Sequence, residues 1–297
     1  MDRNTLAAVG LTVVGMSLIP VGDSAGKLLT TGHGASPGFV ALARFAVGAA
    51  MVAALLRGPV AWRLWADWRV WLRASLIAGG ILCILNALRT EDIATVFGAF
   101  FVGPIVSFGL SVLLLGERPG PGRALLLGVG FAGVLMVVRP GAEVGPGLLW
   151  AVAAGTLYGA FLTASRWLAP FAAPMQLMLT QTAMGTLLLL PFGLTGWPAA
   201  TPAVAGLTLV SGLASATGNV LLVMAYRRAA ATVVAPFVYV QIVSATALGW
   251  GVFGTWPDAV ALAGLAAILA SGLATLALPA PRGGSAATAT GSRRSSM

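Results

Sequence analysis

The sequence predicts an all-α polytopic membrane protein: ten transmembrane helices form two inverted five-helix repeats, with both termini in the cytoplasm. The first observation is composition, because 58% of the 297 residues are hydrophobic and 8% are charged, whereas about a quarter of a soluble domain is charged. The second is a series of apolar runs near 20 residues, the length at which a helix crosses about 30 Å of hydrocarbon. The third is an internal repeat at a spacing of 137 residues.

The apolar runs define ten expected spans. They are apolar on all faces and do not alternate, which favours helices over the strands of a β-barrel. Pro37, Pro174 and Pro202 stand near expected helix starts, where the missing N–H of proline costs nothing. The expected spans are residues 5–24, 37–56, 71–88, 93–115, 121–138, 145–166, 174–194, 203–225, 230–253 and 258–278.

The spans divide the chain into three parts. Residues 1–138 are expected to hold the first five-helix repeat and residues 139–280 the second. Residues 281–297 are polar, small and rich in Gly and Ser, and we expect a disordered cytoplasmic tail.

The basic residues indicate the orientation of these spans. With a cytoplasmic N-terminus, thirteen arginines fall on the inner side and three basic residues on the outer side, with Arg44 inside a span. This bias is typical of cytoplasmic loops, and an even number of spans also places both termini there. The net charge of +9 is therefore interpreted as a topology signal and not as a nucleic-acid surface.

The internal repeat is clearest in the fourth and ninth spans. The string ATVFGAFFVGPIVS at 94–107 returns as ATVVAPFVYVQIVS at 231–244, with seven of fourteen positions identical. Because each half holds an odd number of spans, the second half must enter the membrane from the opposite side. Inverted repeats are typical of transporters that work by alternating access. The same offset pairs Gly10 with Gly147, Gly22 with Gly159, Pro37 with Pro174 and Gly48 with Gly185.

The chain resembles the EamA family of the drug/metabolite transporter superfamily, whose members have ten spans in two five-span repeats. The resemblance covers about residues 5–278. It rests on LARF at 42–45, GPIVSFGLSVLLLGE at 103–117 and GVGFAGVLMV at 128–137. The second half departs from the pattern, with Gln241 at the position of Pro104 and Gly254 at that of Glu117.

Helix-breaking residues at matching places in the two halves indicate a binding site. The fourth span contains Gly98, Gly103 and Pro104, and the ninth contains Pro236. A proline inside a helix frees a carbonyl that is tolerated only where protein or a wet cavity satisfies it. We therefore expect both spans to line the cavity and to take part in gating. A packing kink without a nearby ligand is the alternative.

Polar and aromatic side chains inside the spans supply the candidate substrate contacts. Polar groups are costly to leave unpaired in hydrocarbon and should face the bundle interior, and aromatic rings could stack against a planar substrate. For each of them, interhelical hydrogen bonding or core packing is the alternative. The candidates are Asn86, Phe97, Phe101, Tyr158, Gln181, Asn219, Phe237, Tyr239 and Gln241.

Ionisable residues inside the spans are few. Arg44 could contact a substrate carboxylate or cap neighbouring carbonyls, and Asp23 is expected to pair with Lys27 four residues on. No carboxylate lies clearly at the midplane, and the one histidine, His33, falls in an outer connection. We therefore expect facilitated transport, and proton coupling through Asp23 stays open.

Other functional classes find little support. One His and one Cys supply neither a catalytic cluster nor a metal site, and no nucleotide-binding motif indicates ATP-driven transport. The sequence contains neither a filter loop nor rings of polar side chains, which are the features typical of a channel. We expect no cofactor, no metal and no obligatory protein partner.

The expected function is carriage of a small metabolite across the inner membrane. Because only Arg44 lies clearly within the bilayer, a zwitterionic or neutral substrate fits better than a phosphorylated one. The chain resembles the exporter branch that handles amino acids, notably aromatic ones, and planar cationic toxicants. This resemblance implies outward transport of such compounds, and a proton-coupled or uptake carrier of another metabolite is the alternative.

Overall fold

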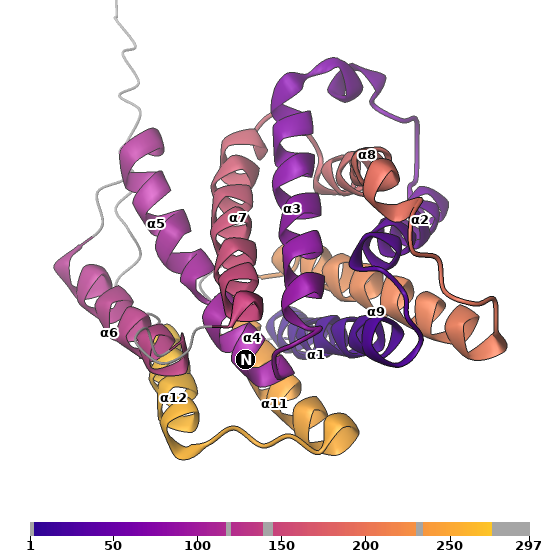
Figure 1. Cartoon of the computed structure of the whole chain (residues 1–297). Coiled ribbons are helices and arrows are strands. Elements are labelled where there is room, and N and C mark those ends of the chain that lie inside the picture. Colours follow the sequence, from indigo (N-terminus) through magenta and orange to yellow (C-terminus); the bar gives the residue numbers. More distant parts are fainter. Residues whose placement is uncertain (1–2, 117–119, 139–144, 230–233, 275–297) are drawn as a thin grey trace, which may run out of the picture.

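A computed structural model describes residues 3–116, 120–138, 145–229 and 234–274, and these residues form a bundle of helices joined by short connections (Figure 1). The helices are α1 (Arg3–Gly32), α2 (Pro37–Leu55), η1 (Trp62–Ala66), α3 (Trp68–Ala87), α4 (Ile93–Phe100), α5 (Val102–Leu115), α6 (Pro121–Val138), α7 (Pro146–Leu168), α8 (Pro174–Gly193), α9 (Pro202–Tyr226), η2 (Ala235–Tyr239), α11 (Val240–Phe253) and α12 (Ala259–Ala274).

The helices match the expected spans in order and type. Seven helical segments of the described chain are long and apolar enough to cross a membrane, and three shorter apolar helices accompany them at 124–138, 237–253 and 259–274. The protein is therefore a multi-pass membrane protein. The expected end of the first span at residue 24 is wrong, because α1 continues to Gly32. The expected tail, 281–297, lies outside the described residues.

Local sequence signals set several helix starts. Ser36 caps α2 by accepting a hydrogen bond from the Phe39 N–H, and Thr201 caps α9 by accepting one from the Val204 N–H. Pro37, Pro174 and Pro202 each begin a helix. The predicted placement of these three prolines is confirmed.

Small residues bring α1 and α9 into close contact. A Cβ atom added to Gly15 would lie 2.8 Å from the carbonyl oxygen of Gly218, and one added to Gly218 would lie 2.6 Å from that of Gly15. In a membrane such residues let helix backbones approach closely. Besides this pair, α3 packs against α7, α2 against α8 and α6 against α12.

The fourth and ninth spans are each broken into two pieces. Phe101, at φ −68° and ψ 3°, separates α4 from α5, and η2 precedes α11. Both second pieces end in a left-handed glycine, Gly116 at φ 66° and Gly254 at φ 67°. Gly254 therefore corresponds to Gly116, and the ungapped pairing of Gly254 with Glu117 is wrong by one residue.

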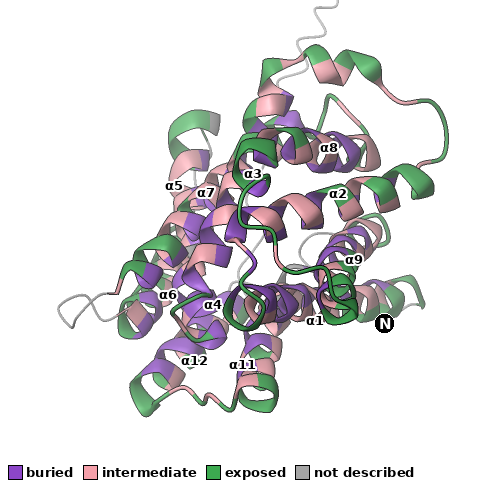
Figure 2. Cartoon of the chain, turned by 45° about the vertical axis from the view of Figure 1, so that its right-hand side comes forward, coloured by how far each residue is buried: buried purple, intermediate pink, exposed green. Residues whose placement is uncertain are grey.

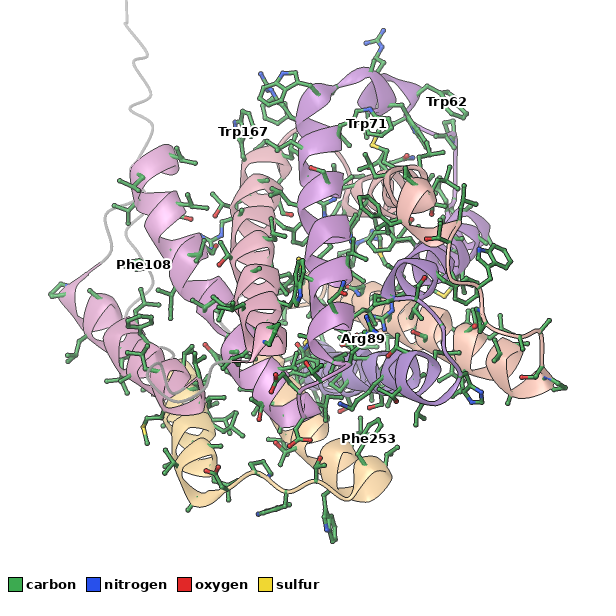
Figure 3. The ribbon with its side chains drawn as sticks, viewed as in Figure 1. Trp62, Trp71, Arg89, Phe108, Trp167 and Phe253 are labelled. Atoms are coloured by element: carbon green, nitrogen blue, oxygen red, sulfur yellow. The ribbon has the colours of Figure 1, made fainter. Side chains whose placement is uncertain are left out.

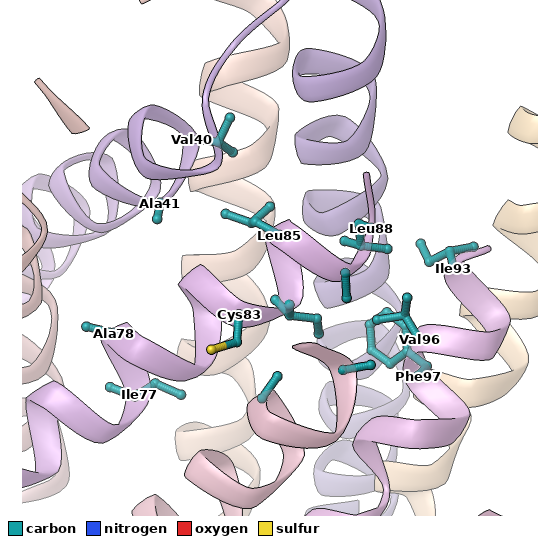
Figure 4. Close-up of a cluster of buried hydrophobic side chains, with 14 of the residues drawn as sticks. Val40, Ala41, Ile77, Ala78, Cys83, Leu85, Leu88, Ile93, Val96 and Phe97 are labelled. Carbon is teal, nitrogen blue, oxygen red and sulfur yellow. The ribbon is translucent and has the colours of Figure 1, made fainter. Parts of the chain in front are cut away.

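Burial separates the inside of the bundle from its lipid-facing surface (Figure 2). The main core lies where α2, α3, α4 and α7 meet, and it contains Val40, Leu85 and Phe97 (Figure 4). Large apolar side chains such as Leu113, 79% exposed, point outward. In Figure 3, Trp62 and Trp167 mark the upper end of the bundle, and Arg89 and Phe253 mark the lower end.

Candidate functional site

A cavity lies halfway along α2, α3, α8 and α9. Each helix contributes residues from near its own middle, for example Gly48 on α2 and Ile77 on α3. Substrate sites of inverted-repeat transporters lie at this depth. The lining residues are Arg44, Phe45, Gly48, Ile77, Ile81, Met178, Gln181, Thr182, Ser215, Ala216 and Asn219.

Two amides on the cavity wall keep hydrogen-bonding capacity for a ligand. The Asn219 side chain donates to the Ser215 carbonyl at 2.8 Å. The oxygen of the Asn219 amide remains available to accept a hydrogen bond. The Gln181 amide makes no hydrogen bond among the described residues. Thr182, by contrast, is turned back on its own helix, since its hydroxyl donates to the Met178 carbonyl at 3.0 Å. Gln181 and Asn219 are therefore the side chains best placed to form hydrogen bonds with a polar substrate.

The cavity is small in this conformation. Its volume is about 70 Å³, room for roughly five water molecules at about one probe sphere each. A metabolite with a ring system would need the four helices to separate.

Arg44 connects the cavity to α1 and α9. Its Nη1 donates to the Asp23 carboxylate at 2.5 Å and its Nη2 to the Gly22 carbonyl at 2.8 Å. Nε and Nη2 also donate to the Ser211 hydroxyl, at 3.2 and 3.0 Å, and this hydroxyl donates to the Gly22 carbonyl at 2.9 Å. Arg44 and Asp23 are 5% and 2% exposed, so the ion pair is buried.

The expected pairing of Asp23 with Lys27 is wrong. The Lys27 amine donates instead to the backbone carbonyls of Leu88 and Glu91, at 2.8 and 2.6 Å, and lies 5.5 Å from the centre of the Phe253 ring. Asp23 pairs with Arg44 because the guanidinium reaches the carboxylate across the α1–α2 contact, whereas the Lys27 amine reaches the carbonyls that follow α3. Lys27 thus joins α1, α3 and α11 at the lower end of the bundle.

A second buried arginine, Arg73, escaped the sequence analysis as a site residue. Its Nε donates to the Ser165 hydroxyl at 2.8 Å and its Nη1 to the Leu177 carbonyl at 3.0 Å. The guanidinium lies 4.6 Å from the centre of the Phe161 ring. Charge counting places Arg73 on the inner side, at the start of the expected span 71–88, and such counting does not distinguish a snorkelling arginine from one held between helices.

The predicted aromatic contacts lie apart from the cavity. Phe97 is fully buried in the main core. Phe101 stacks on Tyr239 at 5.3 Å between ring centres, and the Tyr239 ring lies against Gly272 of α12. Tyr158 lies between Phe100 and Phe161, at 4.8 and 5.8 Å. These rings form a second group along α4, α7 and η2.

The remaining predicted contacts also lie outside the cavity lining. Asn86 donates to the Leu82 carbonyl of its own helix at 2.8 Å. Gln241 is buried on α11, and Phe237 is half-buried in η2. Of the nine candidates, the structure brings Gln181 and Asn219 together with Arg44. The described residues hold no cluster of three His, Cys, Asp or Glu that could bind a metal.

The predicted kink residues lie at helix contacts and helix starts. A Cβ on Gly98 would lie 2.7 Å from a Val137 methyl, and one on Gly103 would lie 2.9 Å from the Gly155 carbonyl oxygen. Pro104 is in the first turn of α5 and Pro236 in that of η2. The breaks therefore coincide with prolines at helix starts.

Several lining residues had no signal of their own in the sequence. Ile77, Ile81 and Met178 are ordinary apolar residues of a span, and Ser215 belongs to a run of small residues. Only the polar pair Gln181 and Thr182, adjacent within an apolar run, marks the α8 wall.

Comparison with protein families gives two matches to one family. The EamA-like transporter family matches residues 24–139 and again residues 145–277. Together the two matches cover most of the chain.

Individual proteins are also similar. A riboflavin transporter of Rhizobium johnstonii is 29% identical over 222 residues, which are 73% of this chain and 72% of that protein. One crystal structure of a protein aligns with a TM-score of 0.64 at 20% identity, over 90% of this chain and 97% of its own. That likeness concerns the fold alone.

Proposed function

We propose, from the premise that this chain belongs to the EamA-like transporter family, that it carries small uncharged or zwitterionic metabolites across the membrane by alternating access. The observation that carries the proposal is the midplane cavity between α2, α3, α8 and α9, whose wall holds Gln181 and Asn219. Such a site can be exposed to either side when the two halves of the protein rock around it.

The pattern of helix contacts supports two halves of five spans related by a pseudo-two-fold axis. If the first five spans are exchanged for the last five, the α1–α9 contact becomes the α7–α3 contact, and the α2–α9 contact becomes the α8–α3 contact. The α2–α8 and α6–α12 contacts map onto themselves. All of these contacts are present, as an inverted repeat requires.

The distribution of charge supports cytoplasmic termini. Arg57, Arg63 and Arg69 lie in or beside η1, at the start of α3, whereas Arg89 follows the other end of α3, where the Lys27 amine bonds to the Leu88 and Glu91 carbonyls. The end of α3 next to η1 is then the cytoplasmic one.

Two lines of support define the first substrates to test. The similar Rhizobium protein is named a riboflavin transporter, and riboflavin is an uncharged, planar and polar molecule. Resemblance to amino-acid exporters adds aromatic amino acids, with export as the proposed direction.

The test is counterflow in liposomes that contain the purified protein. Vesicles loaded with unlabelled riboflavin or tryptophan should accumulate the same labelled compound without ATP. Replacing Gln181 or Asn219 with Ala should lower the rate by about tenfold, the effect of one lost hydrogen bond of about 1.4 kcal/mol. Trp197→Ala is the control, because Trp197 is 64% exposed and distant from the cavity wall.

The same assay decides between the two groups of candidates. If Tyr239→Ala or Gln241→Ala lowers counterflow and the cavity variants do not, the substrate binds along α11 and η2. The transporter proposal itself fails if no gradient drives flux of any neutral, zwitterionic or cationic metabolite in a broad panel.

A further inference from the structure

The cavity wall carries one positive charge, and a neighbouring carboxylate neutralises it. Arg44 is the one charged side chain among the described residues that line the cavity. Its guanidinium is paired with the buried carboxylate of Asp23, which lies behind it on α1. The two charges cancel, so a ligand in the cavity meets a wall with no net charge.

We propose that Asp23 sets the charge selectivity of the transporter: by cancelling Arg44, it restricts the cavity to neutral and zwitterionic substrates and rejects anionic ones such as phosphorylated analogues. This inference rests on the proposed function and defines the substrate class of that same site.

The hydrogen bonds of Arg44 limit what it can offer a ligand. A guanidinium has five N–H donors. The protein occupies its Nε–H, its two Nη2–H groups and one Nη1–H, through Asp23, Gly22 and Ser211. One N–H remains. It suits a single carbonyl or hydroxyl oxygen and not the two-pronged grip that arginine uses on phosphate.

An anionic ligand would bring an unbalanced charge into the bundle. Buried charges are costly unless they are paired, and the cost is greatest where hydrocarbon surrounds the site. The single positive charge of Arg44 cannot neutralise both Asp23 and the ligand, and an exchange of partners leaves the Asp23 carboxylate unpaired in turn. A neutral ligand needs no such exchange.

Arg73 does not supply the missing countercharge at the wall. Its partner Leu177 is adjacent to Met178 in the chain, but Arg73 itself does not line the cavity. Its guanidinium faces the Phe161 ring, Ser165 and the Leu177 carbonyl. No other charged side chain of the described residues lines the cavity.

The test compares a neutral substrate with its anionic analogue. Proteoliposomes would be assayed for counterflow of riboflavin and of riboflavin 5′-phosphate, and in parallel for tryptophan and N-acetyltryptophan, which carries one negative charge. Wild type should move the uncharged member of the pair and not the anion. Asp23→Asn keeps the shape of the side chain but leaves the Arg44 charge uncompensated, and it should raise the anion-to-neutral flux ratio by about tenfold or more.

Three variants separate charge from structure. Ser211→Ala removes a hydrogen bond to Arg44 without altering charge and should keep the wild-type ratio. The double variant Asp23→Asn with Arg44→Gln has a neutral wall again and should also reject the anion. Gln181→Lys adds a positive charge on the wall without disturbing the ion pair, and should admit the anion even if Asp23→Asn does not fold.

The outcomes distinguish this inference from the proposed function. Failure of wild type to move any uncharged compound contradicts the transporter itself. Where wild type moves riboflavin or tryptophan, an unchanged anion-to-neutral flux ratio in Asp23→Asn, or in Gln181→Lys where that variant alone folds, overturns the charge-selectivity inference. An equal shift in Ser211→Ala overturns it too, since a loosened helix contact would then be the cause.

Discussion

Two buried arginines of this bundle are held by different means. Arg44 is paired with a carboxylate, and the pair lies between α1, α2 and α9 beside the cavity. Arg73 is held by a hydroxyl, a backbone carbonyl and the face of an aromatic ring between α3, α7 and α8. Arg44 is thus buried with an acidic partner that neutralises its charge, whereas Arg73 is buried with uncharged partners.

The difference follows from what surrounds each group. Arg73 lies five residues from the start of α3, where a long side chain can extend towards the end of its helix. Arg44 lies near the middle of α2, where an unpaired charge is most costly. The depth of an arginine in the bundle therefore predicts whether it needs an acidic partner.

The largest expected effect comes from breaking the compensated pair on one side. Arg44→Met should leave the Asp23 carboxylate buried without a partner and lower the free energy of unfolding by about 3–5 kcal/mol. The measurement is reversible unfolding in detergent, followed by tryptophan fluorescence. The double variant Asp23→Leu with Arg44→Met should recover most of the loss. If it does not, the hydrogen bonds and not the charges hold this contact together.

A smaller effect is expected at the uncompensated arginine. Arg73→Met removes two hydrogen bonds and a cation–π contact but leaves no opposite charge behind, and should lower the same free energy by about 1–2 kcal/mol. Arg73→Lys, which keeps the charge over Phe161, is the matched control and should lose less. A loss equal to that of Arg44→Met would contradict the distinction drawn between the two sites.

The smallest effect is expected from the hydroxyl beside Arg44. Ser211→Ala removes a hydroxyl that accepts two hydrogen bonds from Arg44 and donates one to the Gly22 carbonyl. Because Arg44 keeps its bonds to Asp23 and Gly22, the loss should be about 0.6 kcal/mol and no more than about 1.7. The same unfolding assay measures it. A loss above that range would mean that Ser211 and not Asp23 fixes the position of Arg44.

The fold could be predicted from the sequence because each of its signals is local. Apolar length identified the spans, and prolines at positions 37, 174 and 202 marked three helix starts. Boundaries were less certain. The structure continues α1 to Gly32, and nothing in the sequence shows that the carbonyls of Leu88 and Glu91 receive the Lys27 amine.

The site was predicted only in part because it depends on pairings between distant segments. Gln181 and Asn219 could be found as polar residues in apolar runs, and both line the cavity. The aromatic residues gave the same kind of signal, but the structure buries Phe97 in the core and stacks Phe101 on Tyr239. One sequence shows which side chains must face inward, not which inward-facing side chains meet.

The length of α1 ties the ion pair to the thickness of the lipid around it. Thirty residues make a rod about 45 Å long, against about 30 Å of hydrocarbon. The Lys27 amine is hydrogen-bonded to the carbonyls that follow α3. These bonds keep α1 from sliding along its own axis to match its length to the thickness of the hydrocarbon. Thicker and thinner bilayers must instead change its inclination. Asp23 lies one helical turn before Lys27. A change in the tilt of α1 therefore moves the Asp23 carboxylate relative to Arg44, and so hydrophobic mismatch affects the charge balance of the cavity.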